Sequence, residues 1–430
     1  MTQSPATPAK ATRLDHFGLN AANFFLAELT GVILPFLSDF LKQQHWNYSL
    51  IGVTVSMAGI GMLVFQIPAG VISDKVWRRR IMLAAASILL GACYGILPHM
   101  IKHPLIVDGL LLVAGMASAF FVPLLAALAL SLVGHKDFDK TFGTNQSWNH
   151  AGNIAASIAT LICVKIFGIA TVFYVVGVLS FLASVCLFLI TRKHLNLDLS
   201  KEHSAAGGSS RAKASHFHPK GLMGAMREQL QTPSVQVLII SVILFNIANA
   251  PGMATVALYL KQLGSNDDAV AWAIVIGQAA MVPVAYLAAR FCSTHGRKPV
   301  MFIAFAALAV RLALYPLTTS PNLILAIMII NGIDAGIYGV AIALICGDLT
   351  KGKEGFNTLL GIMQLTIAVG GVCGPMMQGF ITQNMGFPIT FFTFAVIAAA
   401  GGLFFLFKMP ETGNNANNSE NIEAKPALAI

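Results

Sequence analysis

Charged residues are scarce in this chain, and their scarcity argues against a soluble fold. Only 10% of the 430 residues are Asp, Glu, Lys or Arg, whereas soluble domains carry about a quarter. Hydrophobic residues make up 56% of the chain, and its mean hydropathy is +0.73. Apolar stretches of roughly 20 residues recur, each long enough to cross a hydrocarbon core about 30 Å thick. The composition predicts an all-α polytopic membrane protein whose main partner is the lipid bilayer.

Cysteine is scarce as well, and its six copies show no paired spacing. Nearly all of them fall inside apolar stretches, as small core residues do, so the pattern favours neither a disulfide framework nor a metal site. The chain also lacks the His and Glu helix motif of a membrane-embedded metalloenzyme. We therefore expect no enzyme activity, no metal and no cofactor.

No secretory leader is expected, because residues 1–14 are polar and small and contain no apolar core. The first apolar stretch should then direct targeting itself. Twelve stretches have the length and composition of membrane-spanning helices, six in each half of the chain. They run over residues 17–38, 50–73, 81–98, 104–133, 142–165, 171–191, 235–258, 269–290, 300–318, 323–347, 357–381 and 389–408.

The two halves of the chain repeat each other at an offset of about 217 residues. The loop at residues 68–80 has a faint echo at residues 283–298, and residues 142–146 align with residues 360–364. Repeats of this length in a hydrophobic chain are typical of secondary transporters. The sequence therefore predicts two pseudo-symmetric six-helix bundles.

Acidic residues are outnumbered, 18 against 27 basic ones, and the basic residues are unevenly placed. Lys42, Lys102, Lys165 and Lys261 lie on one side and Arg311 lies within a span, while the other 22 fall in the termini and in the loops of the opposite side. The positive-inside rule then predicts that both termini are cytoplasmic. The net charge of +9 reflects this bias and implies no nucleic-acid partner.

These boundaries predict five segments, two of which are the six-helix bundles. The connection between the bundles is rich in Gly, Ser and basic residues, as a flexible linker is, and the polar C-terminal tail is expected to be disordered. The segments are a cytoplasmic N-terminus (1–16), an N-terminal bundle (17–191), a cytoplasmic tether (192–233), a C-terminal bundle (234–408) and a cytoplasmic tail (409–430).

One loop carries a family motif. Gly70-x-x-x-Asp74-Lys75-x-x-Arg78-Arg79 stands between the second and third spans, and Gly296-Arg297-Lys298 repeats part of it between the eighth and ninth. The pattern resembles the loop signature of the major facilitator superfamily, except that Trp77 stands where glycine is usual. The resemblance covers all twelve spans. It implies that superfamily's fold, with spans 1, 4, 7 and 10 lining a central cavity, and a monomer suffices for this fold.

Charges in these loops could form a cytoplasmic gate. Asp74 can accept hydrogen bonds from Arg78 or Arg79, or face the positive N-terminus of a neighbouring helix. Such contacts bias the conformational equilibrium if they form in only one state. Asp348, near Arg297, is the weaker counterpart in the second half. The alternative is a topology signal with a solvated salt bridge.

Three ionisable residues lie near the midpoints of predicted spans: Glu28, Arg311 and Asp334. Ionisable groups at this depth are costly and are functional by default. Glu28 shares its helix with Asn20 and Asn23, and a lone carboxylate in a low-dielectric medium can exchange a proton near neutrality. Glu28 is therefore the first candidate for proton coupling or for binding a cationic group. The alternative is a buried carboxyl that only holds helices together.

A polar stripe on the tenth span is the second candidate. Asn331, Asp334 and Tyr338 fall within about 60° of arc on one helix face, where they could bind solute or couple protons. Arg311 could pair with Asp334 as a structural ion pair, because burying either charge alone is costly. It could instead face an anionic substrate.

Further amides and a histidine complete the candidate site, and the fifth span is the most polar. Amides in membrane helices often only hold helices together, but their number here favours a cavity lining. His150 can titrate near pH 7 and could share coupling with Glu28. The candidates are Asn145, Gln146, Asn149, His150, Asn153, Asn246, Asn249, Gln278 and Gln364.

The predicted function is secondary active transport of a small polar solute by alternating access, driven by the proton gradient. Export of a metabolite or siderophore-like compound is the leading interpretation and nutrient uptake the alternative, because no single residue separates them. A transporter-like receptor or scaffold without flux is a third hypothesis. The stretch Gly347–Gly352 is similar to one in a group of bacterial efflux proteins, and we expect the inner membrane of a bacterium.

Overall fold

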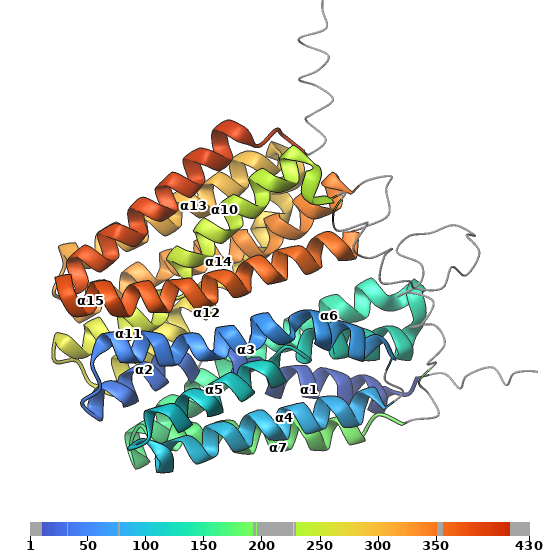
Figure 1. The fold of residues 1–430 in the computed structure, drawn as a ribbon. Helices are drawn as coiled ribbons and strands as arrows, with labels where there is room; N and C mark the ends of the chain where they lie inside the picture. Colours follow the sequence, from blue (N-terminus) through green and yellow to red (C-terminus); the bar gives the residue numbers. More distant parts are fainter. Residues whose placement is uncertain are drawn as a thin grey trace, which may run out of the picture. The chain divides into compact units, whose positions relative to one another are not determined.

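The structure is a computed structural model that describes residues 11–31, 33–75, 78–191, 195, 227, 229–350 and 356–412. Within these ranges every regular element is helical (Figure 1). A hydrocarbon medium offers no partner for backbone N–H and C=O groups, so a helix, which pairs them internally, is the expected element. The prediction of an all-α membrane protein is confirmed.

Contacts along the chain group the helices into two compact units. The first unit contains seven helices from the first half together with Met253–Val275. Its helices are α1 (Arg13–Gly31), α2 (Ile33–Gln43), α3 (Tyr48–Lys75), α4 (Arg79–Ile96), α5 (Pro104–Ser118), α6 (Phe121–Phe167) and α7 (Thr171–Phe188), and the 3-10 turn η1 (Leu97–Met100) follows α4.

The second unit contains the described residues between His216 and Gly252 and all described residues from Ile276 onward. Its helices are α10 (Pro233–Asn249), most of α12 (Asp267–His295), α13 (Arg297–Leu314), the 3-10 turn η3 (Tyr315–Leu317), α14 (Pro321–Leu349) and α15 (Phe356–Lys408). Helix α11 (Gly252–Gln262) belongs almost entirely to the first unit. The seventh predicted span is therefore shared between the two units.

Ten helical stretches in the described part of the chain are long and apolar enough to cross a membrane. They cover eleven of the twelve predicted spans. The first predicted span falls on α1 and α2, neither of which counts among the ten. The last stretch, Leu359–Lys408, holds two predicted spans in 50 residues, about 75 Å at the helical rise and far more than one crossing needs.

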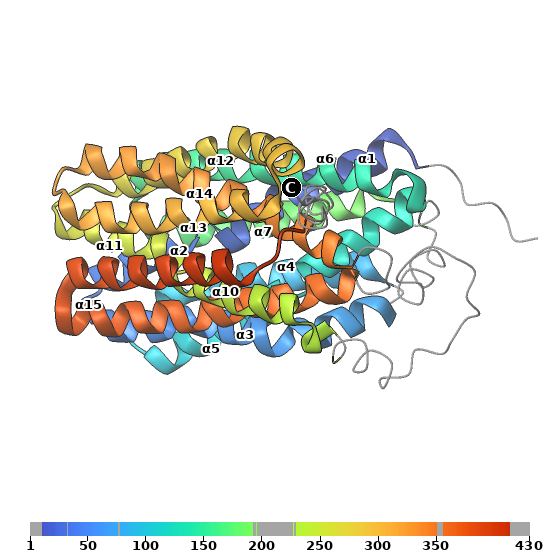
Figure 2. The same cartoon turned by 90° about the horizontal axis from the view of Figure 1, so that it is seen from above.

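Helix α15 turns back on itself at Gly386. This residue has φ 81°, a left-handed value that glycine adopts without steric cost, and it interrupts the helical backbone between the two predicted spans. Figure 2 shows the two arms of α15 on either side of this turn. The sequence predicted a loop at residues 382–388, and the structure replaces it with a single-residue break.

Small residues let helices approach at backbone distance in the first unit. A Cβ added to Gly115 of α5 would lie 2.0 Å from the carbonyl oxygen of Ala58 in α3, and one added to Gly61 of α3 would lie 2.0 Å from that of Leu112. Each glycine therefore lies against the backbone of the other helix. Such close approach supplies packing energy where lipid removes the hydrophobic driving force between helices.

The α3–α5 contact predicts a site-specific intolerance to side-chain size. Gly115→Leu should lower the melting temperature of the purified protein strongly, because overpacking costs about 1–3 kcal/mol or more when the obstacle is backbone. Gly109→Leu on the same helix is the matched control, because a Cβ at Gly109 meets nothing within 4 Å. Melting curves in detergent measure both variants. Equal shifts for the two would contradict the close helix approach.

Candidate functional site

A buried ion pair lies at the centre of the second unit. Arg311 Nε of α13 lies 2.8 Å from Asp334 Oδ2 of α14, and both side chains are 0% exposed. Burying either charge alone would cost several kcal/mol, so mutual pairing is what makes both tolerable. The pairing is incomplete: Arg311 Nη1 and Asp334 Oδ1 are buried without a hydrogen-bond partner among the described residues.

Arg311 also contacts the break between α10 and α11. Its Nη2 donates to Asn249 Oδ1 over 2.9 Å, at the last residue of α10. A Cβ added to Gly252, the first residue of α11, would lie 3.5 Å from Arg311 Nη1. One guanidinium therefore joins α10, α13 and α14 beside the point where the seventh span is interrupted. Asn249 is thereby placed as a partner of this ion pair.

A second polar contact joins α10 and α14 one helical turn away. Asn246 Nδ2 donates to the hydroxyl oxygen of Tyr338 over 2.7 Å. The Tyr338 ring stacks on that of Phe245, with centroids 4.2 Å apart and an interplanar angle of 3°. Phe245 is 0% exposed, whereas Tyr338 is only half-buried. The tyrosine ring is therefore held on one face and at its hydroxyl.

The predicted stripe on α14 is divided among three neighbouring helices. Asp334 pairs with α13 and Tyr338 with α10, while the amide of Asn331 lies beside Gly277 of α12, 2.8 Å from where a Cβ would stand. Gln278, the next residue of α12, keeps a buried Oε1 without a hydrogen-bond partner among the described residues. Gln364 of α15 is half-buried.

In the first unit, polar residues follow one side of α6. Asn145 and Asn153 are buried, and Asn153 Nδ2 donates to Asn149 Oδ1 over 3.5 Å. Three atoms on this side, Asn145 Oδ1, His150 Nδ1 and Asn153 Oδ1, have no hydrogen-bond partner among the described residues. The side chain of Gln146 lies outside the described residues. That this side of α6 lines a cavity stays a prediction.

Helix α1 packs against α6 through aromatic rings. Trp148 makes edge contacts with Phe17 and Phe24 at centroid distances of 6.3 and 6.2 Å. On α1, Asn20 is half-buried, and Asn23 donates to the carbonyl oxygen of Leu19 over 3.0 Å within its own helix. Glu28, the first coupling candidate, falls within α1, but its side chain lies outside the described residues.

The loop motif of the first half is anchored by Arg79. This arginine is buried, and it donates to the carbonyl oxygen of Ser73 over 3.2 Å and to the hydroxyl of Ser131 over 3.0 Å. It thus ties the end of α3 to α6. Arg78 is exposed, and the side chain of Asp74 lies outside the described residues.

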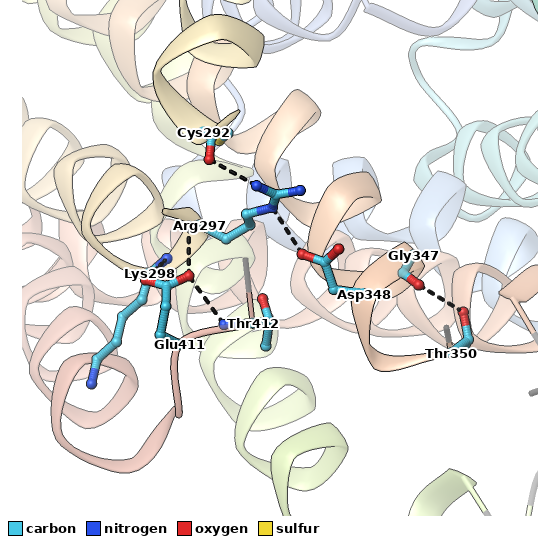
Figure 3. A network of polar contacts seen from close by, with 8 residues as sticks. All are labelled: Cys292, Arg297, Lys298, Gly347, Asp348, Thr350, Glu411 and Thr412. Carbon is cyan, nitrogen blue, oxygen red and sulfur yellow. Dashed lines mark hydrogen bonds and ion pairs between the residues drawn. The ribbon is translucent and has the colours of Figure 1, made fainter. Parts of the chain in front are cut away.

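The corresponding motif of the second half forms a charged network (Figure 3). Arg297 Nε lies 2.8 Å from Asp348 Oδ2, and Arg297 Nη1 donates to the carbonyl oxygen of Cys292 over 2.9 Å. Glu411 accepts hydrogen bonds from the backbone N–H groups of Arg297 (2.8 Å) and Lys298 (3.3 Å), at the start of α13. A carboxylate is favourable there because the helix N-terminus carries partial positive charge.

Sequence reasoning missed Glu411 and two ion pairs of the first unit. Asp39, 1% exposed, lies 3.6 Å from Lys261, and Lys165 lies 2.8 Å from Asp268. In each pair one residue belongs to α1–α7 and the other to Met253–Val275. These residues stand near predicted span ends, where charges are ordinarily solvated, so no local pattern distinguishes them. In the part of the chain that the structure describes, no group of three or more His, Cys, Asp or Glu residues is placed to hold a metal ion.

Comparisons with known proteins identify similar chains over nearly the whole length. A family model described as "Major Facilitator Superfamily" matches residues 19–262 and 237–429. An "uncharacterized MFS-type transporter" of Mycobacterium tuberculosis is 30% identical over 427 residues, which make up 98% of each chain. The "multi-drug resistance efflux pump PmrA" of Streptococcus pneumoniae is 22% identical, over 90% of this chain and 94% of its own. The crystal structure of the nucleoside transporter NupG matches with a TM-score of 0.72 at 16% identity, covering 92% of this chain and 99% of that one.

The buried ion pair predicts a non-additive pattern of stability. Arg311→Met alone should destabilise the protein by about 3–5 kcal/mol, because it leaves the Asp334 carboxylate buried without its cation. The double variant Arg311→Met with Asp334→Leu should recover most of that loss, because no unpaired charge remains. Unfolding of the single and double variants in detergent measures the difference. If the double variant loses the sum of the two single losses, the pair is not what stabilises this region.

Proposed function

The chain belongs to the major facilitator superfamily, and from that premise we propose that it exports a small polar solute by alternating access, in exchange for protons. Membership makes it a secondary transporter with an all-α membrane fold. The substrate class, the direction and the proton coupling are our proposal. So are a bacterial inner membrane with cytoplasmic termini and a monomeric state, without a nucleic-acid partner.

The observation that supports the proposal is a set of buried polar atoms that have no hydrogen-bond partner among the described residues. Each such atom costs about 1–3 kcal/mol when it is buried away from water. Amides that served only to hold helices together would be paired, as Asn246 is with Tyr338. A solute that exchanges hydrogen bonds with these atoms accounts for their persistence. They are Gln66 Oε1, Asn145 Oδ1, His150 Nδ1, Asn153 Oδ1 and Gln278 Oε1.

Among the ionisable candidates, we favour Glu28 and His150 for proton coupling. Asp334 shares its pocket with Arg311, so its charge is already compensated. A proton carrier must be neutralised and ionised once in each cycle, which a fixed partner opposes. His150 has a ring nitrogen without a hydrogen-bond partner among the described residues. We therefore assign Asp334 and Arg311 to the framework and coupling to Glu28 and His150.

The loop charges are suited to gating. The ion pair between Arg297 and Asp348 connects the start of α13 with the end of α14, and Arg79 connects α3 with α6. Contacts of this kind shift a conformational equilibrium only by the difference in their strength between two states. We propose that Asp74, Arg78 and Arg79, with Arg297 and Asp348, stabilise the state that is closed to the cytoplasm.

One relative supports export over uptake. PmrA of Streptococcus pneumoniae is named a multidrug efflux pump, and it aligns with 90% of this chain. Uptake of a nutrient is the alternative, since neutral amides such as Asn145 and Asn153 suit hydrophilic nutrients equally well. Ligand binding without flux would instead indicate a receptor or scaffold.

Flux in proteoliposomes tests the proposal. A library of small metabolites is screened for uptake into vesicles with an imposed pH gradient of either sign. Proton antiport accumulates solute when the lumen is acidic and symport when it is alkaline, whichever way the protein is inserted. We expect accumulation with an acidic lumen. Accumulation with an alkaline lumen would establish uptake instead, and movement that ignores the gradient would make the protein a facilitator.

Two variants locate the coupling. Glu28→Gln and His150→Gln should each abolish gradient-driven accumulation while retaining solute exchange across the membrane without a gradient, because exchange needs binding but not proton transfer. Asp108→Asn and His99→Gln are matched controls; Asp108 accepts from Thr54 and His99 contacts Tyr174. Coupling that survives in both test variants would remove Glu28 and His150 from the mechanism.

A further inference from the structure

The amide of Asn246 determines the hydrogen-bond polarity of Tyr338. Asn246 Nδ2 lies 2.8 Å from the carbonyl oxygen of Val242 and 2.7 Å from the Tyr338 hydroxyl oxygen. A backbone carbonyl can only accept, so the side-chain atom that faces it must be the amide nitrogen. That nitrogen has no lone pair to offer. The Tyr338 oxygen is therefore the acceptor of this bond, and Asn246 is the donor.

The hydrogen of the Tyr338 hydroxyl is consequently not used in the bond with Asn246. A phenol carries one O–H donor in addition to its acceptor sites. Among the described residues, none accepts this hydrogen; the contacts of Tyr338 are the bond from Asn246 and the stacked ring of Phe245. A donor without an acceptor in a partly dehydrated place is costly, and it rewards a ligand that supplies the acceptor.

The donor is also fixed in position. The ring of Tyr338 lies parallel to the fully buried ring of Phe245. Helix α15 packs closely against Asn246, since a Cβ added to Gly370 of α15 would lie 2.3 Å from the Cβ of Asn246. The hydroxyl can therefore turn its hydrogen but cannot move away. Because Phe245 covers one face and is itself fully buried, the exposure that Tyr338 retains belongs to its other face and its edge.

The nearest charge on α14 does not make this region favour a cationic solute over one that accepts a hydrogen bond. Asp334 lies one turn before Tyr338, but its carboxylate is paired with Arg311 and is 0% exposed. A cationic solute would find that charge already compensated. An acceptor oxygen on the solute would find an oriented O–H group.

We propose, on the premise of the transport function above, that the Tyr338 hydroxyl donates a hydrogen bond to the solute. The second unit then selects solutes with a carboxylate or carbonyl oxygen over solutes whose polar group is an ammonium. An ammonium group has no lone pair, so it leaves the phenol hydrogen unpaired when it displaces water. Asn246 acts as a positioning residue, because it sets the direction in which the phenol donates.

Equilibrium binding of two matched probes tests the proposal. Benzoate and benzylammonium share a phenyl ring and differ in whether the polar group accepts or donates. Dissociation constants are measured by dialysis of radiolabelled probe against the purified full chain in detergent. The wild type should bind benzoate more tightly than benzylammonium. Tyr338→Phe keeps the stacked ring and should weaken benzoate about tenfold while changing benzylammonium less than twofold.

A second variant separates polarity from the mere presence of the phenol. Asn246→Asp puts a carboxylate oxygen where the amide nitrogen donates, so the Tyr338 hydroxyl should turn inward and donate to it. Benzoate binding should then fall although Tyr338 is intact. Tyr315→Phe is the matched control, because Tyr315 donates to the sulfur of Met328 inside the same unit. Its probe affinities should equal those of the wild type, and melting curves confirm that each variant is folded.

Failure of this inference is distinguishable from failure of the transport proposal. If benzoate fails to bind, or if Tyr338→Phe changes both probes alike, the donor assignment is wrong even when flux is present in proteoliposomes. If the probe preference follows Tyr338 and Asn246 as expected but no solute moves, the binding inference holds and the transport proposal fails. Loss of benzoate affinity in Tyr315→Phe to the same degree would also overturn the assignment, because the effect would not be local.

Discussion

Hydrocarbon supplies no hydrogen bonds, and the rest of this structure depends on how the chain meets that constraint. Its backbone satisfies it with helices alone throughout the described ranges. The fully buried ion pair of Arg311 with Asp334 satisfies it for two charges at once. The same guanidinium reaches Asn249, the last residue of α10, just before Pro251. The framework role of the pair follows from this arrangement, because removing either charge would strand the other.

Several buried polar atoms of the described residues do not meet this constraint. The paired amides of Asn23 and Asn246 are committed to Leu19 and Tyr338, whereas Asn145, Asn153 and Gln278 keep unpaired oxygens. A membrane protein that keeps such atoms loses stability for each one. In our proposal, this loss is compensated when a solute binds.

Composition was enough to predict the helical membrane fold, because the length and polarity of spanning helices are set by the bilayer and not by tertiary contacts. The family was predicted from the loop motif and the half-chain repeat. The pairing of Arg311 with Asp334 was also within reach, since two lone charges of opposite sign at the same depth have few other partners. Partners that depend on how each helix is rotated about its own axis could not be predicted from the sequence. Nothing in the sequence tells that Asn331, Asp334 and Tyr338 contact three different helices, or that Asp39 and Glu411 are held by residues more than a hundred positions away. The break at Gly386 was likewise expected as a loop, because a single left-handed glycine is invisible in a hydropathy profile.

The central claim is that the two units alternate in exposing a solute site to the two sides of the membrane. Distances between spin labels in reconstituted protein test it most directly, with the six native cysteines replaced. One pair at Leu14 and Ser293 reports on the predicted cytoplasmic side, and a second pair at Lys102 and Thr319 reports on the other; all four positions are exposed. Adding a transported solute, or shifting the pH from 8 to 5, should lengthen one distance and shorten the other. Distances that stay constant, or that change in the same direction on both sides, would contradict alternating access.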